Sequence, residues 1–131
     1  MNEMKLKKHY QILQDASFEK IERILKDIHY DEVNALSYFV AGLFNIDRCE
    51  LFSKNRSNEV AMARWMLFYA LWFSTHKTYK EISRITALEG IAYDISAIHT
   101  GIRKIQEMIE NDESVKTKWI LTKKFINLKH Q

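Results

Sequence analysis

The sequence lacks proline and is poor in glycine and cysteine, and each shortage excludes a class of protein. Its 131 residues contain no proline, three glycines and one cysteine. Because proline and glycine interrupt helices, their shortage favours a mostly helical chain. A lone cysteine, Cys49, excludes an internal disulfide framework and is typical of a reducing compartment. We expect Cys49 to be a small buried residue.

Long hydrophobic runs are also missing. The most apolar stretch covers residues 60–73 and contains Arg64, and it is shorter than the roughly 20 residues that a membrane-spanning helix needs. The first fifteen residues, MNEMKLKKHYQILQD, have no apolar stretch long enough for a signal peptide. We therefore expect a cytoplasmic protein in which residues 58–75 form a helix that is buried on most sides. Its aromatic residues are expected in the core: Trp65, Phe68, Trp72 and Phe73.

The net charge of +3 is small, but the charges are unevenly distributed. Residues 53–84 carry six basic and two acidic residues, a net charge of +4, whereas residues 31–52 and 106–114 carry −3 and −4. Residues 115–131 hold five lysines and no acidic residue. A basic middle between acidic flanks indicates an oriented electric field rather than a generally cationic surface.

Apolar spacing predicts an all-α bundle of about six or seven helices. The expected helices cover residues 3–14, 18–29, 32–44, 58–75, 79–88, 95–109 and 114–127, with a short helical turn near 46–52. Thr78 and Glu81 have the spacing of a capping box, and Asn45 and Gly90 are natural helix stops. We expect a helical extension over residues 1–30 and one domain over residues 31–131.

A short helix at 79–88, a turn and a longer helix form a helix-turn-helix candidate. The polar loop SKNRS, residues 53–57, places Lys54 and Arg56 just before the long helix 58–75. Consecutive helices are more often only packed against each other, so this pattern alone leaves both DNA binding and plain packing open.

Four stretches carry a resemblance to a known family. They are VAGLF (40–44), ELFSKNRSNEVAMAR (50–64), TYKEIS (78–83) and DISAIHTGIRKI (94–105). In their order and approximate spacing, residues 33–128 resemble the C-terminal DNA-binding domain, domain IV, of the bacterial replication initiator DnaA. The resemblance implies a helix-turn-helix bundle that binds double-stranded DNA as a stand-alone module.

The resemblance also implies roles for individual residues. Arg56, with Lys54 beside it, would enter the minor groove, and the helix that begins at Asp94 would read the major groove. The expected DNA-binding residues are Lys54, Arg56, Arg64, Lys77, Thr78, Tyr79, Lys80, Asp94, Ser96 and Arg103. Alternatives remain open for Arg64, which would otherwise pair with Glu59 or cap an edge of the core, and for Arg103, which would otherwise stay solvated.

The sequence departs from the family pattern at two places. The family's histidine and second threonine at the start of the reading helix are Ile95 and Ala97 here, so fewer hydrogen bonds remain for reading bases. The stretch ALEGIAYD makes the connection before Asp94 several residues longer. This insertion would either tilt the second helix or lengthen the first.

We predict a double-stranded DNA-binding protein in replication or transcription control, in a phage or mobile element. The phage or mobile-element setting rests on the absence of a G-x-x-x-x-G-K-[ST] phosphate loop and of room for an ATPase domain. The alternative is a protein–protein interaction module that keeps the fold and has lost base reading. Partners other than DNA would be a second copy or another protein, through the N-terminal helices or the 58–75 helix. No catalytic or metal-ligand spacing is visible, so we expect no enzyme, no cofactor and no metal.

Overall fold

The computed structural model describes residues 33–75 and 77–129, in which all regular secondary structure is helical and no strand occurs. The predicted all-α fold is confirmed, although the described residues hold five α-helices and one 3-10 helix rather than six or seven helices. The helices predicted at 3–14 and 18–29, and the predicted boundary after residue 30, lie outside the described residues. From Leu36 onward the chain forms one compact unit.

The first described helix covers residues 33–43 and ends as its sequence predicts. Asn45 adopts a φ of 55°, the left-handed conformation that terminates helices. A short 3-10 helix, η1 (Arg48–Phe52), follows. Its Leu51 is fully buried and Phe52 is half-buried, so this short helix packs on the core through these two residues.

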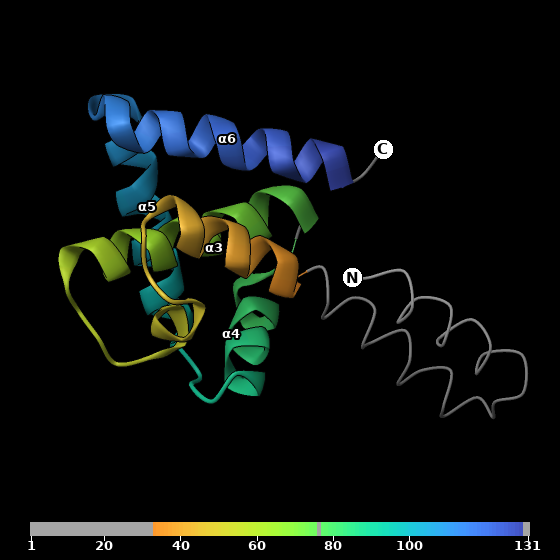
Figure 1. The fold of residues 1–131 in the computed structure, drawn as a ribbon. Helices are drawn as coiled ribbons and strands as arrows, with labels where there is room; N and C mark the ends of the chain where they lie inside the picture. Colours follow the sequence, from red (N-terminus) through yellow and green to blue (C-terminus); the bar gives the residue numbers. More distant parts are fainter. Residues whose placement is uncertain (1–32, 76, 130–131) are drawn as a thin grey trace, which may run out of the picture. The chain divides into compact units, whose positions relative to one another are not determined.

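Helix α3 (Asn58–Thr75) lies at the centre of the unit and packs against η1 and against every later helix (Figure 1). Its buried residues recur three and four positions apart and cover more than one face: Val60, Ala63, Met66, Leu67, Phe68, Ala70 and Leu71. Of the four aromatic residues expected in the core, Phe68 is buried and Trp65 is half-buried. The prediction is wrong for Trp72 and Phe73, which are 39% and 44% exposed. Phe73 packs edge-on against Trp119 and Tyr69, with ring centroids 5.3 and 6.2 Å apart.

Helix α4 (Tyr79–Leu88) begins with the predicted capping box. The backbone N–H of Glu81 donates to Thr78 Oγ1 at 3.2 Å, and the backbone N–H of Thr78 donates to a Glu81 carboxylate oxygen at 3.3 Å. The helix ends before Gly90, whose φ of 109° is a conformation that glycine adopts without strain. Helix α4 thus ends at Leu88, as predicted, and residues 89–94 form the connection to the next helix.

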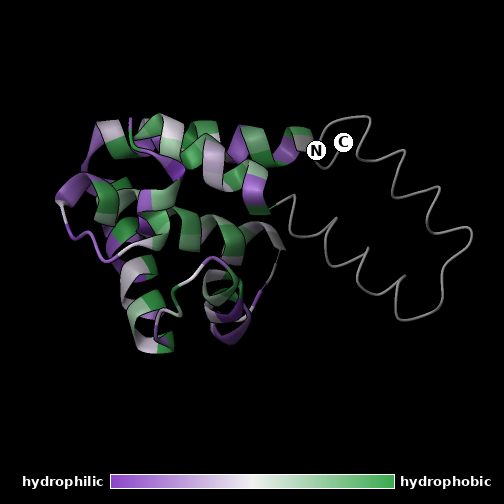
Figure 2. Ribbon diagram, turned by 60° about the horizontal axis from the view of Figure 1, so that its bottom comes forward, coloured by the Kyte–Doolittle hydropathy of each residue, from purple (hydrophilic) through white to green (hydrophobic). Residues whose placement is uncertain are grey.

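Helices α5 (Ile95–Asn111) and α6 (Glu113–Lys129) complete the unit. Figure 1 shows α5 running past α3 to the end at which α6 begins. In α5 the residues Ile98, Ile102 and Ile105 are buried at helical spacing. Hydrophobic and hydrophilic residues alternate along the ribbons in Figure 2, as expected for helices that bury one face.

Two further sequence predictions concern Cys49 and membrane insertion. Cys49 is exposed, so its predicted burial is wrong. It sits on the outer side of η1, whereas the neighbouring Leu51 turns inward. Within residues 33–75 and 77–129, no helix combines the length and hydrophobicity that crossing a membrane requires.

Candidate nucleic-acid interface

The basic loop, residues 53–57, is shaped by its own polar side chains. Ser53 Oγ donates to the carbonyl oxygen of Glu50 at 2.7 Å and accepts from the backbone N–H of Asn55 at 3.2 Å. Asn55 Oδ1 in turn accepts from the backbone N–H of Ser57 at 2.9 Å. Such local bonds define a turn conformation without helix or strand. Lys54 and Arg56 extend from this turn and are exposed, as the sequence predicts.

Arg64 lies inside the turn rather than outside it. Only 8% of the residue is exposed, and its Nε donates to the carbonyl oxygen of Leu51 at 2.9 Å. Its Nη2 lies within 2.9–3.1 Å of the carbonyl oxygens of Glu50, Ser53 and Asn55. A buried guanidinium needs such acceptors to offset its desolvation. The structure therefore favours a structural role for Arg64, whose hydrogen-bond partners are carbonyl oxygens of the turn rather than the carboxylate of Glu59.

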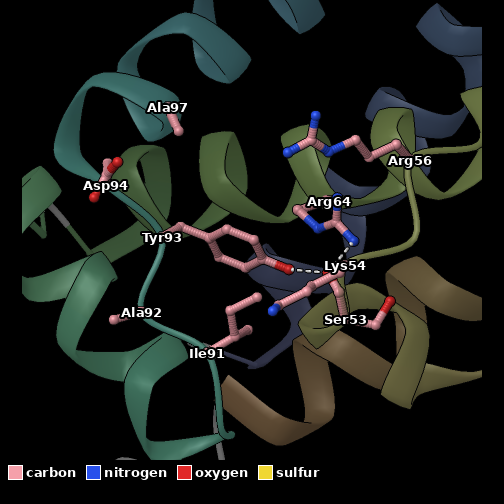
Figure 3. Close-up of a pocket in the computed structure, with 9 residues that line it drawn as sticks. All are labelled: Ser53, Lys54, Arg56, Arg64, Ile91, Ala92, Tyr93, Asp94 and Ala97. Carbon is pink, nitrogen blue, oxygen red and sulfur yellow. Dashed lines mark hydrogen bonds between the residues drawn. The ribbon is translucent and has the colours of Figure 1, made fainter.

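Tyr93 joins the same turn from the α4–α5 connection. Its hydroxyl lies 3.0 Å from the carbonyl oxygen of Leu51 and 2.8 Å from that of Ser53. Its ring lies 5.0 Å from Arg64 Cζ, within the range of a cation–π contact. Figure 3 shows the ring extending from the connection toward Arg64 and the basic loop. Burial raises the pKa of the Tyr93 phenol, so the hydroxyl is protonated and can donate at neutral pH.

The first turn of α5 presents the residues that the resemblance assigns to base reading. Asp94 occupies the N-cap position, as predicted, but its side chain makes no capping hydrogen bond. Ser96 and Ala97 are exposed, and Ile95 is 49% exposed. A carboxylate and a hydroxyl can hydrogen-bond base edges, and apolar carbons can contact a thymine methyl.

An open pocket of about 430 Å³ lies between the basic loop and the first turn of α5 (Figure 3). One side is formed by Lys54, Arg56 and Arg64, and the other by Asp94 and Ala97. The remaining lining residues are Ser53, Ile91, Ala92 and Tyr93. The structure thus brings together the two parts of the chain that the resemblance assigns to the two grooves of DNA, and it places a concave surface between them.

The candidates at the start of α4 form a separate group outside this pocket. Thr78 and Lys80 are exposed, and Tyr79 is half-buried with its ring 5.4 Å from that of His99. Lys77 is only 8% exposed, so little of its side chain is available to a phosphate. The capping box already places the Glu81 carboxylate at the positive dipole end of α4, beside the exposed Lys80.

Arg103 lies farther along α5 and is exposed. Together with Thr100, Lys104 and Glu107 it lines a second hollow of about 250 Å³. Lys104 Nζ in turn lies 5.1 Å from the Trp65 ring centroid. The structure therefore separates Arg103 from the pocket that holds Lys54 and Arg56.

The expected DNA-binding residues do not include Ser53 and Ala97 of the pocket, nor three residues of the connection before α5: Ile91, Ala92 and Tyr93. All three belong to the stretch in which the chain departs from the family pattern. An aromatic residue immediately before an N-cap is the one signal that singles out Tyr93. Among the described residues, no cluster of histidine, cysteine, aspartate or glutamate is suited to hold a metal ion.

Comparisons with known proteins agree with the initiator resemblance over part of the chain. No protein-family model matches. The chromosomal replication initiator protein DnaA of Aliarcobacter butzleri (strain RM4018) is 35% identical over 77 residues, which cover 59% of this chain. The match spans 17% of the length of that initiator. This chain is therefore similar to a short part of a chromosomal replication initiator.

Proposed function

We propose that this protein binds double-stranded DNA in the manner of the C-terminal domain of DnaA. The observation that carries the proposal is the pocket between the exposed cations Lys54 and Arg56 and the exposed first turn of α5. The initiator similarity supports a replication role.

The proposed mechanism divides the work between two elements. The basic loop places Arg56 in the minor groove, where inserted arginines are attracted to the negative potential of narrow A·T-rich tracts. Helices α4 and α5 act as the helix-turn-helix, with Asp94 and Ser96 at base edges in the major groove. Lys80 and Thr78 face a phosphate at the start of α4. Binding needs no catalytic step, so we propose a binding protein and not an enzyme.

A salt titration on duplex DNA tests the proposal. Fluorescence anisotropy of a labelled random-sequence duplex is expected to show binding at about 50 mM salt that weakens steeply as salt is added. Lys54→Ala should lower the slope of log affinity against log salt by about 0.9, the value for one lost phosphate contact. Lys124→Ala is the matched control, because Lys124 is an exposed lysine on α6 away from the pocket, and it should leave the slope unchanged.

Absence of duplex binding at low salt would contradict the proposal and favour the protein-interaction module. The exposed apolar residues Ile95, Trp72 and Phe73 are the observation behind that second candidate. Equal slopes for Lys54→Ala and Lys124→Ala would remove the basic loop from the interface while leaving DNA binding itself in place.

A second experiment separates the two grooves. Duplexes that bind the wild type are first selected from a random pool. The affinities of Arg56→Ala and Ser96→Ala for these duplexes are then measured. Arg56→Ala should weaken binding to most duplexes, with a bias toward A·T-rich ones, whereas Ser96→Ala should cost roughly 1–3 kcal/mol on the selected sites alone. Wild-type binding by Arg56→Ala, together with loss of binding by Ser96→Ala, would show that the loop is only a solvated entry to α3.

A further inference from the structure

Tyr93 is held by α4 through its backbone. Its carbonyl oxygen accepts a hydrogen bond from Ser83 Oγ at 2.7 Å, and its N–H donates to Thr86 Oγ1 at 3.3 Å. Thr86 is fully buried, and its hydroxyl also donates to the carbonyl oxygen of Ser83 at 2.9 Å. The backbone of Tyr93, one residue before α5 begins, is therefore fixed to the preceding helix.

The Tyr93 side chain is held by the turn that leads into the basic loop. Its hydroxyl shares one proton between the carbonyl oxygens of Leu51 and Ser53, at 3.0 and 2.8 Å. The same two oxygens accept from Arg64, each at 2.9 Å. A carbonyl oxygen has two acceptor sites, so both donors can be satisfied at once. Tyr93 and Arg64 thus hold the same two peptide groups from two sides.

The ring of Tyr93 adds apolar and cation–π contacts to this cluster. The ring lies edge-on to the buried ring of Phe68, with the two centroids 5.5 Å apart. It also lies 5.0 Å from Arg64 Cζ. These contacts restrict the ring to one orientation, in which the hydroxyl reaches the basic loop (Figure 3). Tyr93 therefore contacts α4, α3 and the turn that leads into the basic loop.

We propose that Tyr93 is a positioning residue that couples the basic loop to the first turn of α5, so that the minor-groove and major-groove contacts are made together. The proposal rests on the DNA-binding function proposed above. Tyr93 precedes Asp94 directly, and Ser53 precedes Lys54 directly, so one hydroxyl sets the spacing between the two groups of DNA-contacting residues. The loop and the first turn of α5 would contact the two grooves on either side of one sugar–phosphate strand. Because their spacing is already set in the free protein, less conformational entropy is lost when DNA binds.

Tyr93→Phe tests the coupling because it removes only the hydroxyl and keeps the ring contacts. On a selected duplex we expect binding to weaken roughly three- to tenfold, the effect of about one lost hydrogen bond. Tyr69→Phe is the matched control, since Tyr69 lies on α3 with its ring stacked on Trp119, and it should bind like the wild type. Equal binding by the two variants would overturn the proposal.

A double-mutant cycle distinguishes positioning from a general loss of stability. In the wild type, Arg56→Ala and Ser96→Ala should be non-additive in binding free energy, because each site depends on the placement of the other. In the Tyr93→Phe background the two substitutions should become additive. A merely structural role would weaken every variant by the same factor and leave the non-additivity unchanged, and that result would refute the coupling.

Amide hydrogen exchange on the full chain without DNA tests the link independently of function. Asn55, Ser57 and Ile98 are suitable reporters, because their N–H groups donate to Ser53 Oγ, Asn55 Oδ1 and the Asp94 carbonyl oxygen. Tyr93→Phe should speed exchange in both the loop and α5, and Tyr69→Phe in neither. Faster exchange at both sites with no duplex binding by the wild type would reject the DNA function and retain the link. Unchanged exchange in Tyr93→Phe would reject the link even if the wild type binds DNA.

Discussion

At Gly101 the backbone of α5 approaches the ring of Trp65 on α3. A Cβ atom at this position would lie 2.5 Å from Trp65 Cδ1, well inside van der Waals contact. Because the clash involves the indole ring, relief requires the two helices or the ring to move. Gly101→Ala is therefore expected to lower the free energy of unfolding by about 1–3 kcal/mol in a denaturant titration.

Gly42→Ala provides the matched control for that prediction. A Cβ atom at Gly42 would meet nothing within 4 Å, and the residue lies in the helix over 33–43. Its stability should stay unchanged or rise by up to about 1 kcal/mol, because alanine restricts the unfolded chain. If Trp65→Leu does not reduce the cost of Gly101→Ala, the ring is not the cause of the destabilisation.

The phenol of Tyr93 is expected to make the free energy of unfolding decrease at alkaline pH. Burial raises its pKa, and the nearby Arg64 offsets part of that shift. In the unfolded chain the phenol loses its proton at about pH 10. At that pH the folded protein still holds the proton. The stabilisation is therefore fully present below the unfolded pKa and is lost as pH rises through the folded pKa. Urea unfolding across this alkaline range should show a steeper loss for the wild type than for Tyr93→Phe, and parallel curves would contradict the assignment.

At the scale of one element, the capping box controls the start of α4. Thr78→Ala removes the acceptor for the N–H of Glu81 and should cost about 1 kcal/mol of stability at neutral pH. The control is Thr117→Ala, since the Thr117 hydroxyl lies exposed on α6 and bonds only the Glu113 carbonyl oxygen in the preceding turn. Thermal unfolding of both variants checks the prediction. Equal decreases in melting temperature would show that the Thr78 cap contributes no more stability than the Thr117 hydroxyl.

The capping box also predicts that the stability of the protein decreases at acidic pH. Hydrogen bonds from Thr78 lower the pKa of Glu81 below its usual value. The stabilisation is present above the unfolded pKa of roughly 4.3 and is lost as pH falls through the lower folded pKa. In acid titrations of stability, Glu81→Gln should remove this part of the loss. A Glu81→Gln curve parallel to the wild type would mean that another carboxylate is responsible.

For the whole molecule, the central position of α3 predicts where the structure is most stable. Ala63, Met66, Leu67 and Ala70 have no exposed surface, and α3 packs on every other labelled element. Native-state hydrogen exchange should therefore be slowest in α3. Addition of duplex DNA should slow exchange in the loop and in the first turn of α5 together. Slowest exchange in α6 would contradict the central role of α3.

Local features of this protein follow from the sequence alone. The bounds of α3 and α4, the capping box at Thr78 and the stops at Asn45 and Gly90 were all predicted, because spacing, capping and left-handed turns depend on residues a few positions apart. The exposure of Lys54 and Arg56 follows in the same way from a segment without apolar residues.

Burial of single side chains was decided by the tertiary structure. Arg64 and Lys77 were expected at a DNA surface and are buried, whereas Cys49 was expected inside and is exposed. Arg64 finds its acceptors nine to fourteen residues away, in a turn whose shape no helical period describes. Tyr93 reaches the same turn from 40 residues away. Such contacts depend on how the elements pack against one another, and so the sequence could name the loop and the reading helix but not the residue that joins them.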